Sequence, residues 1–512
     1  MFQRVVTYKI ALKLFLGVLA FACGKQTLAQ TPNKTLSPEA VFTRCHLQLT
    51  GMAPDDKTNP QYLAVKNGTK DPSQACIEIF NLAKLDGKGE LKLQNNLLAR
   101  RVLSRIHNIH TNFLTQKVPY PNDVSSYTAM ANDIDEPALY FTRAALVQGA
   151  KYSEVLTHNS GLAGRRRVLN GTPLRTLSTQ RLFTPLGSTS TDFNFPRDSF
   201  TMAFYAWNST NFGAHVEHME IPDSDLTEFG ALVGVKDRKE ITIPNGFISG
   251  ISSSLGGANR EVLKSQYNNP ILNEHFGGGI LGSQSYIIAN INLPNTVRPD
   301  GLNQINRRLG ARIYEDMLCH QLPTLRPSDV EAFVAPRSSF PFQQQNACMQ
   351  CHQSFDPLAY GYRNLVLSRS AFGAVRDQGG YLVSGMFKVP NLNDSNFFST
   401  TAPNGKIAFR SLLDHKLVSQ SFSNLNQLGS ALAQTDDFYL CAAKKYYKTF
   451  TGVNVQLTDR EPAGTVQAAH QNEVIKLGKF LKTTQSLEKM LKMLFQSKIY
   501  QSTDFSATEV SE

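Results

Sequence analysis

The chain has 512 residues, enough for about three domains that each bury a core of their own. With 41% hydrophobic and 18% charged residues, its composition is that of a globular protein and excludes a disordered or fibrous one. The formal net charge of +11 would permit nucleic-acid binding. The export signal described next places the protein where nucleic acid is scarce, so we expect no nucleic-acid partner.

Residues 1–29 have the pattern of an export signal. The apolar run LFLGVLAFA follows basic residues and is shorter than the roughly 20 residues that a membrane-spanning helix needs. Two cleavage sites compete: one before Cys23, which resembles the lipidated cysteine of a bacterial lipobox, and one between Ala29 and Gln30. Cleavage after Ala29 removes four basic and no acidic residues, which lowers the charge from +11 to +7. Both cleavage sites imply export from the cytoplasm of a Gram-negative-type bacterium. The protein would lie in the periplasm, or at the outer membrane if Cys23 carries a lipid anchor.

Helix-start signals open the mature chain. Ser37 and Asp71 are each followed by proline, the pattern of a helix N-terminus. The first helix is expected to end at Thr50, and a loop is expected between the two helices. Further helices are predicted at 91–114 and 137–148.

Four of the seven cysteines are candidates for disulfides. Cys23 is removed or lipidated under either cleavage, and two others belong to the motif below. The remaining four are Cys45, Cys76, Cys319 and Cys441. In an oxidising compartment this even number predicts two disulfides among three possible pairings. A Cys45–Cys76 bridge is the local choice, because the first two helices carry these residues.

Residues 159–300 differ in composition, with more Gly, Ser, Asn and Thr. Short alternating stretches at 231–237, 239–246 and 286–294 predict strands, so we expect a mixed α+β region. Helical periodicity returns at 304–318 and continues after 405, where leucines and methionines recur at a spacing of 3.6 residues.

The segment Cys348–His352 reads C-x-x-C-H. Two haem vinyl groups need two cysteine thiols about one helical turn apart, and the histidine that follows can bind the iron. This motif in an exported chain predicts one covalently attached haem c, held by Cys348 and Cys351, with His352 as the proximal iron ligand. Met386, on a turn-rich stretch, is the candidate distal ligand, although a methionine there also fits simple apolar packing.

Three other interpretations of the motif are weaker. A thiol oxidoreductase would place C-x-x-C after a strand in a βαβ unit, whereas a Pro/Gln-rich segment precedes Cys348. A disulfide between Cys348 and Cys351 would close a strained small ring. A zinc site needs further ligands. The pairs with suitable spacing are His107/His110 and His215/His218, but paired histidines on a helix are more typical of a surface.

Other short patterns have ordinary explanations. Cys45–His46 resembles a single-cysteine haem site, but a disulfide accounts for its cysteine. Cys319–His320 lacks an earlier cysteine. The glycine-rich segment 277–282 fits G-x-G-x-x-G without a βαβ unit around it, so we expect a turn.

Several segments carry a family resemblance. Asp356-Pro357-Leu358 follows the motif, then Asn364 and the segment 373–376. Further segments at 275–282, 307–323 and 428–452 fit the same pattern, and 49–54 and 151–157 fit it loosely. Together they resemble the exported planctomycete-type cytochrome c-like proteins, a multi-domain family with domains of unknown function around one C-x-x-C-H haem module. The resemblance covers about residues 150 to 500.

This resemblance has two implications. The family pattern has cysteines at the positions of Cys319 and Cys441, which implies a Cys319–Cys441 disulfide that joins the C-terminal helices to the haem module. Ala359 and Arg363 depart from the usual residues, and so does the Gln-rich approach to Cys348. None of these departures touches a thioether or iron-ligand position.

The expected protein is mainly α with an α+β middle region. The predicted units are a signal peptide (1–29), an N-terminal helical domain (36–158), the mixed region (159–300), a cytochrome c-like haem module (301–395), a C-terminal helical domain (405–501) and a flexible tail (502–512). The expected function is electron transfer to an unidentified redox partner protein. Two alternatives stay open: a surface binding or structural protein with a structural haem, and a haem enzyme with an open distal site.

Overall fold

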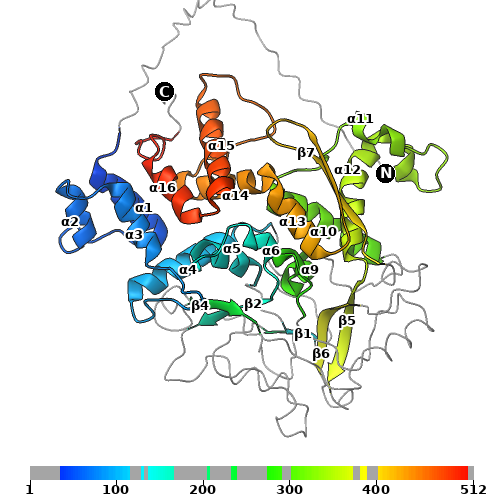
Figure 1. Ribbon diagram of the computed structural model, residues 1–512, viewed down its shortest axis with the longest axis horizontal. Helices are drawn as coiled ribbons and strands as arrows, with labels where there is room; N and C mark the ends of the chain where they lie inside the picture. The colour runs from blue at the N-terminus through cyan, green and yellow to red at the C-terminus, as the bar shows by residue number, and fades with distance from the viewer. Residues whose placement is uncertain are drawn as a thin grey trace, which may run out of the picture.

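The computed structural model describes residues 35–115, 128–131, 136–166, 204–207, 232–238, 274–290, 301–372, 381–388 and 402–505. In these residues the protein is mainly α-helical with some β-structure, which confirms the predicted class (Figure 1). The signal 1–29 with Cys23, the strand expected at 239–246, the pair His215/His218, the segment 373–376 and the end of the tail lie outside the described residues. No helix in the described ranges is long and apolar enough to cross a membrane.

The helices are α1 (Pro38–Thr50), α2 (Pro60–Lys66), α3 (Pro72–Asn81), α4 (Leu97–Thr111), α5 (Glu136–Leu146), α6 (Glu154–Thr157), α9 (Gln284–Asn290), α10 (Gly301–Leu318), α11 (Pro327–Val330), α12 (Asn346–Ala359), α13 (Leu425–Gln434), α14 (Asp436–Thr451), α15 (Val466–Thr484) and α16 (Leu487–Gln496). The strands are β1 (Thr128–Ala131), β2 (Leu162–Arg166), β3 (Phe204–Trp207), β4 (Leu232–Asp237), β5 (Leu365–Phe372), β6 (Tyr381–Lys388), β7 (Gly405–Arg410) and β8 (Leu417–Phe422). Figure 1 shows α1, α2 and α3 at one end of the molecule and α11 and α12 at the other.

The first two predicted helices begin where proline sets the backbone for a helical start. Asp71 accepts a hydrogen bond from the backbone N–H of Gln74 at 2.8 Å, and α1 ends at Gly51, whose φ is 76°. The expectation of a plain loop between the helices is wrong, because α2 lies there. Its start carries the same signal, since Asn59 accepts a bond from the N–H of Tyr62 and is followed by proline.

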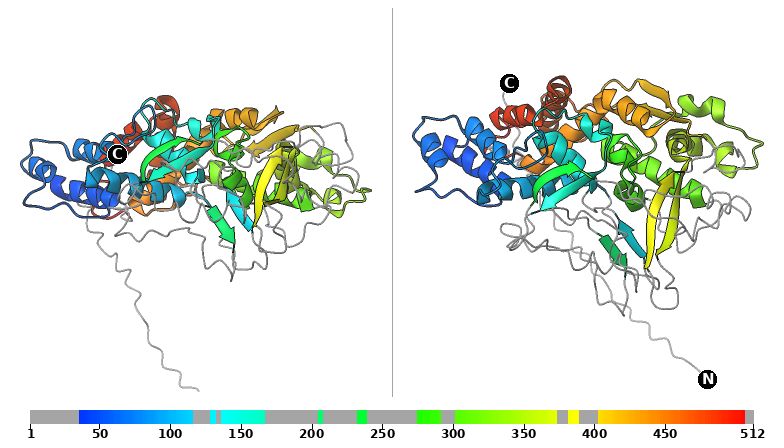
Figure 2. Two further views of the ribbon diagram at one scale, coloured as in Figure 1. Left: turned by 90° about the horizontal axis from the view of Figure 1, so that it is seen from below. Right: turned by 60° about the horizontal axis from the view of Figure 1, so that its bottom comes forward.

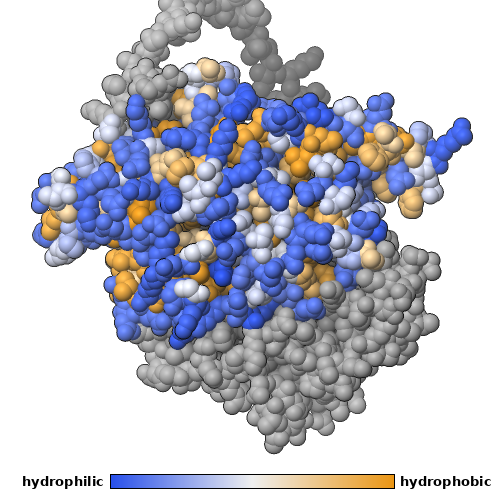
Figure 3. Space-filling model, viewed as in Figure 1, coloured by the Kyte–Doolittle hydropathy of each residue, from blue (hydrophilic) through white to orange (hydrophobic). Residues whose placement is uncertain are grey.

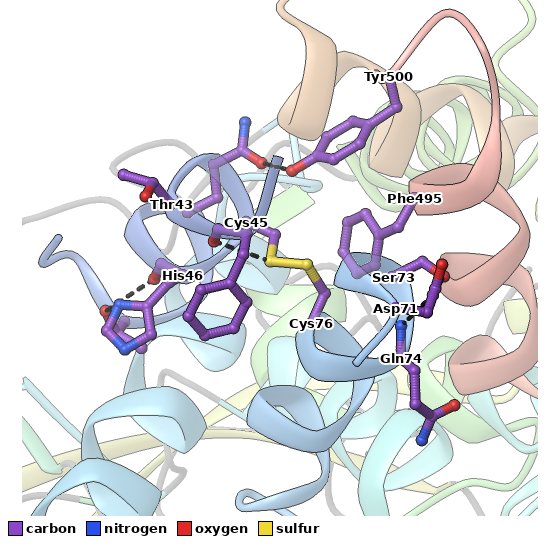
Figure 4. Close-up of a disulfide and its surroundings, with 12 residues drawn as sticks. Thr43, Cys45, His46, Asp71, Ser73, Gln74, Cys76, Phe495 and Tyr500 are labelled. Carbon is purple, nitrogen blue, oxygen red and sulfur yellow. Dashed lines mark hydrogen bonds between the residues drawn. A yellow bond between two sulfur atoms is a disulfide. The ribbon is translucent and has the colours of Figure 1, made fainter. Parts of the chain in front are cut away.

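A disulfide joins Cys45 of α1 to Cys76 of α3, with Cα atoms 5.9 Å apart, as the sequence predicts. Both cysteines are fully buried. Figure 4 shows Phe495 and Tyr500, from the far end of the chain, beside this bridge. The N-terminal helices therefore pack against the C-terminal residues.

The histidine pair on α4 is buried in the core, so the expectation of surface histidines is wrong for His107 and His110. Nδ1 of each ring is hydrogen-bonded to Oγ1 of Thr142, at 3.1 and 2.9 Å, and Nε2 of His110 is bonded to the Tyr446 hydroxyl at 2.7 Å. Burial lowers the pKa of His110 well below its ordinary value. These partners hold the pair in place as part of the packing of α4 on α5 and α14.

Strands and helices mix in the described part of residues 159–300, as expected. Strands also occur outside it, which the sequence did not predict: β1 lies in the predicted N-terminal helical domain, β5 and β6 lie in 301–395, and β7 and β8 lie at the start of the predicted C-terminal helical domain. β2 pairs antiparallel with β4, which confirms the strand predicted at 231–237. A second sheet has the order β3-β1-β6-β5, in which only β1 and β6 run parallel; Figure 2 shows the hairpin of β5 and β6 (yellow) with β1 and β3 beside it.

The strand predicted at 286–294 is wrong over residues 286–290, which belong to α9; the rest of it lies outside the described residues. Its side chains Tyr286, Ile287 and Ala289 are all buried. A short apolar run that is buried on every side has no polar face, so its period cannot tell a strand from a helix.

The glycine-rich segment 277–282 is a turn, as expected. Gly277, Gly278 and Gly279 have positive φ, and the chain continues into a short 3-10 turn. A Cβ atom on Gly279 would collide with the carbonyl of Val155, so the absence of a side chain lets this turn pack directly against α6.

The C-terminal helices are joined to α10 by the predicted disulfide between Cys319 and Cys441, whose Cα atoms are 5.1 Å apart. Next to it, Nε2 of His320 is hydrogen-bonded to a carboxylate oxygen of Asp437 at 2.7 Å, and both side chains are buried. The bridge and this pair fix the end of α10 against α14.

One contiguous cluster of buried apolar residues runs from Val41 to Tyr500, and a small separate cluster lies beneath α12. The segments that the sequence assigns to three helical units contribute to the large cluster together. The boundaries between these units stay a prediction.

Candidate functional site

The C-x-x-C-H motif forms the first turns of α12. Cys348, Cys351 and His352 are spaced i, i+3 and i+4, so their side chains share one face of the helix. All three are partly exposed, whereas Met349, which points away from Cys351, is buried, and so is Leu358 near the end of the helix. The helix therefore presents two thiols and an imidazole together at the molecular surface.

Close packing on α10 and β7 holds α12 in place. A Cβ atom on Gly310 of α10 would approach the Phe355 carbonyl to 2.8 Å, so only a glycine allows the two helices to lie this close. On the buried side, the Tyr314 hydroxyl accepts a hydrogen bond from the N–H of Ala408 at 3.1 Å. The amide of Gln350 donates to the Leu325 carbonyl at 3.0 Å. These contacts give the motif a rigid support.

The two motif cysteines are free thiols. Burial and the neighbouring Cys348 raise the pKa of the Cys351 thiol. In a thiol-exchange catalyst the pKa of the attacking cysteine is lowered, because the thiolate is the nucleophile. The segment that leads into α12 is the 3-10 turn Pro341–Gln344. This turn stands where a thiol oxidoreductase would have a strand, and it argues against that function.

The imidazole of His352 has a defined hydrogen-bond partner. Its Nδ1 lies 2.9 Å from Oδ2 of Asp356, four residues later on the same helix. A carboxylate oxygen can only accept, so Nδ1 donates the proton, and in the neutral ring Nε2 then carries the lone pair. Asp356 is in turn held by Arg307 of α10, whose Nε donates to Oδ1 at 2.6 Å and whose second nitrogen donates to Oδ2 at 3.1 Å.

Aromatic rings fix the plane of the same imidazole. The ring of Phe342 stacks on His352 with centroids 4.1 Å apart and planes 21° apart, and Phe355 lies at 4.8 Å. The guanidinium of Arg307 lies over the other ring of this stack, 5.3 Å from the Phe342 centroid. His352 is therefore positioned through its edge and one face before any ligand binds.

Large apolar side chains near the motif are exposed. The ring of Phe340 is 6.0 Å from that of Phe342 and is 58% exposed, and Phe333 is 49% exposed. Figure 3 shows hydrophobic residues on the surface at the end of the molecule that carries α11 and α12. An apolar, planar group attached to α12 would find apolar side chains beside it.

The other candidates are placed as follows. Met386 lies in β6 opposite Leu367 of β5, and its side chain is outside the described residues, so its role stays a prediction. The cysteines of Cys45–His46 and Cys319–His320 are both in disulfides. No group of three or more His, Cys, Asp or Glu side chains that could hold a bare metal ion occurs in the described ranges.

Two residues of the site escaped the reasoning from sequence. Asp356 belongs to the segment that carries the family resemblance, but its bond to His352 was not foreseen. The i, i+4 spacing on a helix could have revealed this bond. Arg307 lies on another helix, and no local pattern could have paired it with Asp356.

Comparisons with family models, with curated proteins and with solved structures find no match for this chain.

Proposed function

We propose that this chain is an exported c-type cytochrome with one haem, which transfers electrons to a partner redox protein. The observation that carries the proposal is the arrangement on α12, where two free thiols one turn apart adjoin an imidazole whose Nδ1 proton is held by a carboxylate. That arrangement leaves Nε2 as the ligand atom, in the way that metal-bound histidines are usually oriented.

The residues present fit a haem better than a bare metal ion. A haem supplies four of its iron's ligands itself, so the protein needs to add only one or two. Zinc would need a fuller set of protein ligands. The partly exposed phenylalanines beside His352 suit the apolar edge of a macrocycle.

In this proposal Cys348 and Cys351 hold the haem. Each thiol would add across a vinyl group: a sulfur–carbon bond would form, the thiol hydrogen would go to the other vinyl carbon, and no electrons would be gained or lost. His352 provides the proximal ligand through Nε2. The haem supplies a one-electron Fe(III)/Fe(II) couple when it is bound, and the chain fixes its position and surroundings.

The resemblance to the planctomycete-type cytochrome c-like family supports the same function, together with export and a cytochrome c-like module at 301–395. A lipid on Cys23 would anchor the protein to the membrane. The large helical remainder of the chain suits docking to a redox partner, because a free electron carrier does not need it.

The test is the intact mass and the reduced-minus-oxidised spectrum of protein exported from a host with a cytochrome c maturation system. We expect the added mass of one haem and a sharp low-spin α band. The double variant Cys348→Ala/Cys351→Ala should lose both, whereas Cys45→Ala/Cys76→Ala, which removes two cysteines elsewhere, should keep the α band. A wild-type chain without added mass, with the two thiols bridged to each other, would refute the proposal.

The same preparation separates the electron carrier from its alternatives. Rapid reversible reduction of a low-spin haem supports electron transfer, and loss of the low-spin spectrum in Met386→Ala would identify the distal ligand. A redox-inert haem would indicate a structural role, and a high-spin iron that binds cyanide or peroxide would indicate an enzyme with an open site.

A further inference from the structure

We propose that Asp356, held in place by Arg307, fixes the proton of His352 on Nδ1 and thereby lowers the reduction potential of the iron that His352 would bind, and that the charge of Arg307 moderates this effect. This inference rests on the proposed function, and it adds a determinant of the potential that lies outside the C-x-x-C-H motif.

Hydrogen bonds connect the side chains of His352, Asp356 and Arg307 in sequence. His352 and Asp356 are only 20% and 14% exposed, so water competes weakly for the bond between them. Arg307 donates a hydrogen bond to each carboxylate oxygen of Asp356, which restrains this carboxylate from rotating away from His352. Because Phe342 stacks on the imidazole, the ring cannot turn Nδ1 away from Asp356 without losing that contact during the rotation.

The chemistry gives the two residues opposite effects. A carboxylate that accepts the Nδ1 proton makes the imidazole a more basic ligand, and a more basic ligand favours Fe(III) over Fe(II). The guanidinium draws negative charge from the carboxylate and weakens this effect. Loss of the Asp356 charge should therefore raise the potential, and loss of the Arg307 charge should lower it.

A purely structural pair would behave differently. If Arg307–Asp356 only joined α10 to α12, loosening it would alter stability without setting the tautomer of His352. Haem loading alone cannot separate these roles, so the test measures the tautomer and the potential.

The first measurement uses the full chain without haem, through the ¹⁵N NMR signals of the His352 ring at a pH above the ordinary pKa of imidazole. We expect a protonated Nδ1 in the wild type and a shift of the proton toward Nε2 in Asp356→Leu. A wild-type ring protonated on Nε2 would overturn the inference, whatever the outcome of haem attachment.

The second measurement is the reduction potential of the haem-loaded protein. Asp356→Asn keeps an oxygen that can accept from Nδ1 but removes the charge. We expect its Fe(III)/Fe(II) ratio at a fixed poise to fall about tenfold, a rise of about 59 mV for a one-electron couple. Arg307→Gln should shift the potential in the opposite direction.

The matched control is Asp329→Asn, which removes the same charge from a carboxylate that bonds Arg410 instead of a histidine. It should move the potential much less than Asp356→Asn does. Equal shifts in the two asparagine variants, or an unchanged potential in Asp356→Asn, would overturn the inference. Failure of the wild type to acquire haem would refute the proposed function and would leave the tautomer result to stand by itself.

Discussion

The two disulfides should contribute unequally to stability, because they close loops of very different length. Cys319 and Cys441 are 122 residues apart in sequence, and Cys45 and Cys76 only 31. A disulfide restricts the unfolded chain in proportion to the logarithm of this separation. At 25 °C this relation gives about 4.9 kcal/mol for the long loop and about 3.7 kcal/mol for the short one.

The perturbation is a pair of double variants, Cys319→Ala/Cys441→Ala and Cys45→Ala/Cys76→Ala. Each removes two sulfur atoms, all of them buried except that of Cys319, which is partly buried, so most of the cost of the lost side-chain packing cancels between them. The difference that remains is 1.5RT times the logarithm of the ratio of the separations, about 1.2 kcal/mol. We therefore expect the long-loop variant to be the less stable of the two.

The assay is urea unfolding of the oxidised protein, followed by far-ultraviolet circular dichroism and extrapolated to water. The control Cys348→Ala/Cys351→Ala removes two thiols that close no loop, and it should leave the free energy of unfolding of the haem-free chain nearly unchanged. If the short-loop variant lost as much stability as the long-loop variant, the argument from loop length would be refuted.

Three further predictions concern the core. His110→Gln should weaken the pH dependence of stability between about pH 7.5 and about pH 5.5. In this range the unfolded wild-type chain binds a proton on this imidazole, whose ordinary pKa is 6.5, but burial keeps the folded ring neutral. Urea titrations should therefore show that, as the pH is lowered, wild-type stability decreases more steeply than that of the variant, by up to about 1.4 kcal/mol per pH unit. Gly429→Ala should cost about 1–3 kcal/mol in the same assay, since its Cβ would collide with a backbone carbonyl of α6, while Gly87→Ala, which meets no atom within 4 Å, should cost less than about 0.5 kcal/mol. Tyr314→Phe should raise the rate of hydrogen exchange at the Ala408 amide and cost about 1–3 kcal/mol, because that buried N–H loses its acceptor; unchanged exchange would contradict this.

The helix starts could be predicted from sequence because their cause is local. The Asp71 side chain caps α3, and the prolines after Ser37 and Asp71 preset the backbone of the first helical residue; the Ser37 side chain itself makes no capping bond in α1. The start of α2 carries the same signal at Asn59 and was open to the same reasoning. By contrast, α9 could not be distinguished from a strand, because the surrounding core and not its own sequence decides which faces are buried.

The residues of the candidate site also fall into two groups, those that a local pattern predicts and those that only tertiary packing brings to the site. Cys348, Cys351 and His352 could be predicted as candidate site residues, because their C-x-x-C-H spacing brings two thiols and an imidazole together on one helix. The Cys319–Cys441 pairing was implied by the family resemblance, since nothing local connects two residues that are 122 positions apart. Arg307 joins the site only through the packing of α10 on α12, a tertiary contact with no local signature in the sequence.

The contact between the two ends of the described chain has a consequence for the order in which the protein can fold. The backbone N–H of Leu36 donates to the carbonyl of Gln501 at 2.7 Å, and the guanidinium of Arg44 in α1 donates to the carbonyls of Tyr500 and Ser502. Tyr500 and Ser502 lie 456 and 458 residues beyond Arg44 in the sequence, so α1 cannot complete its packing until they have been synthesised. Since α12 is synthesised before them, its two free thiols are already part of the chain while the large core is still incomplete.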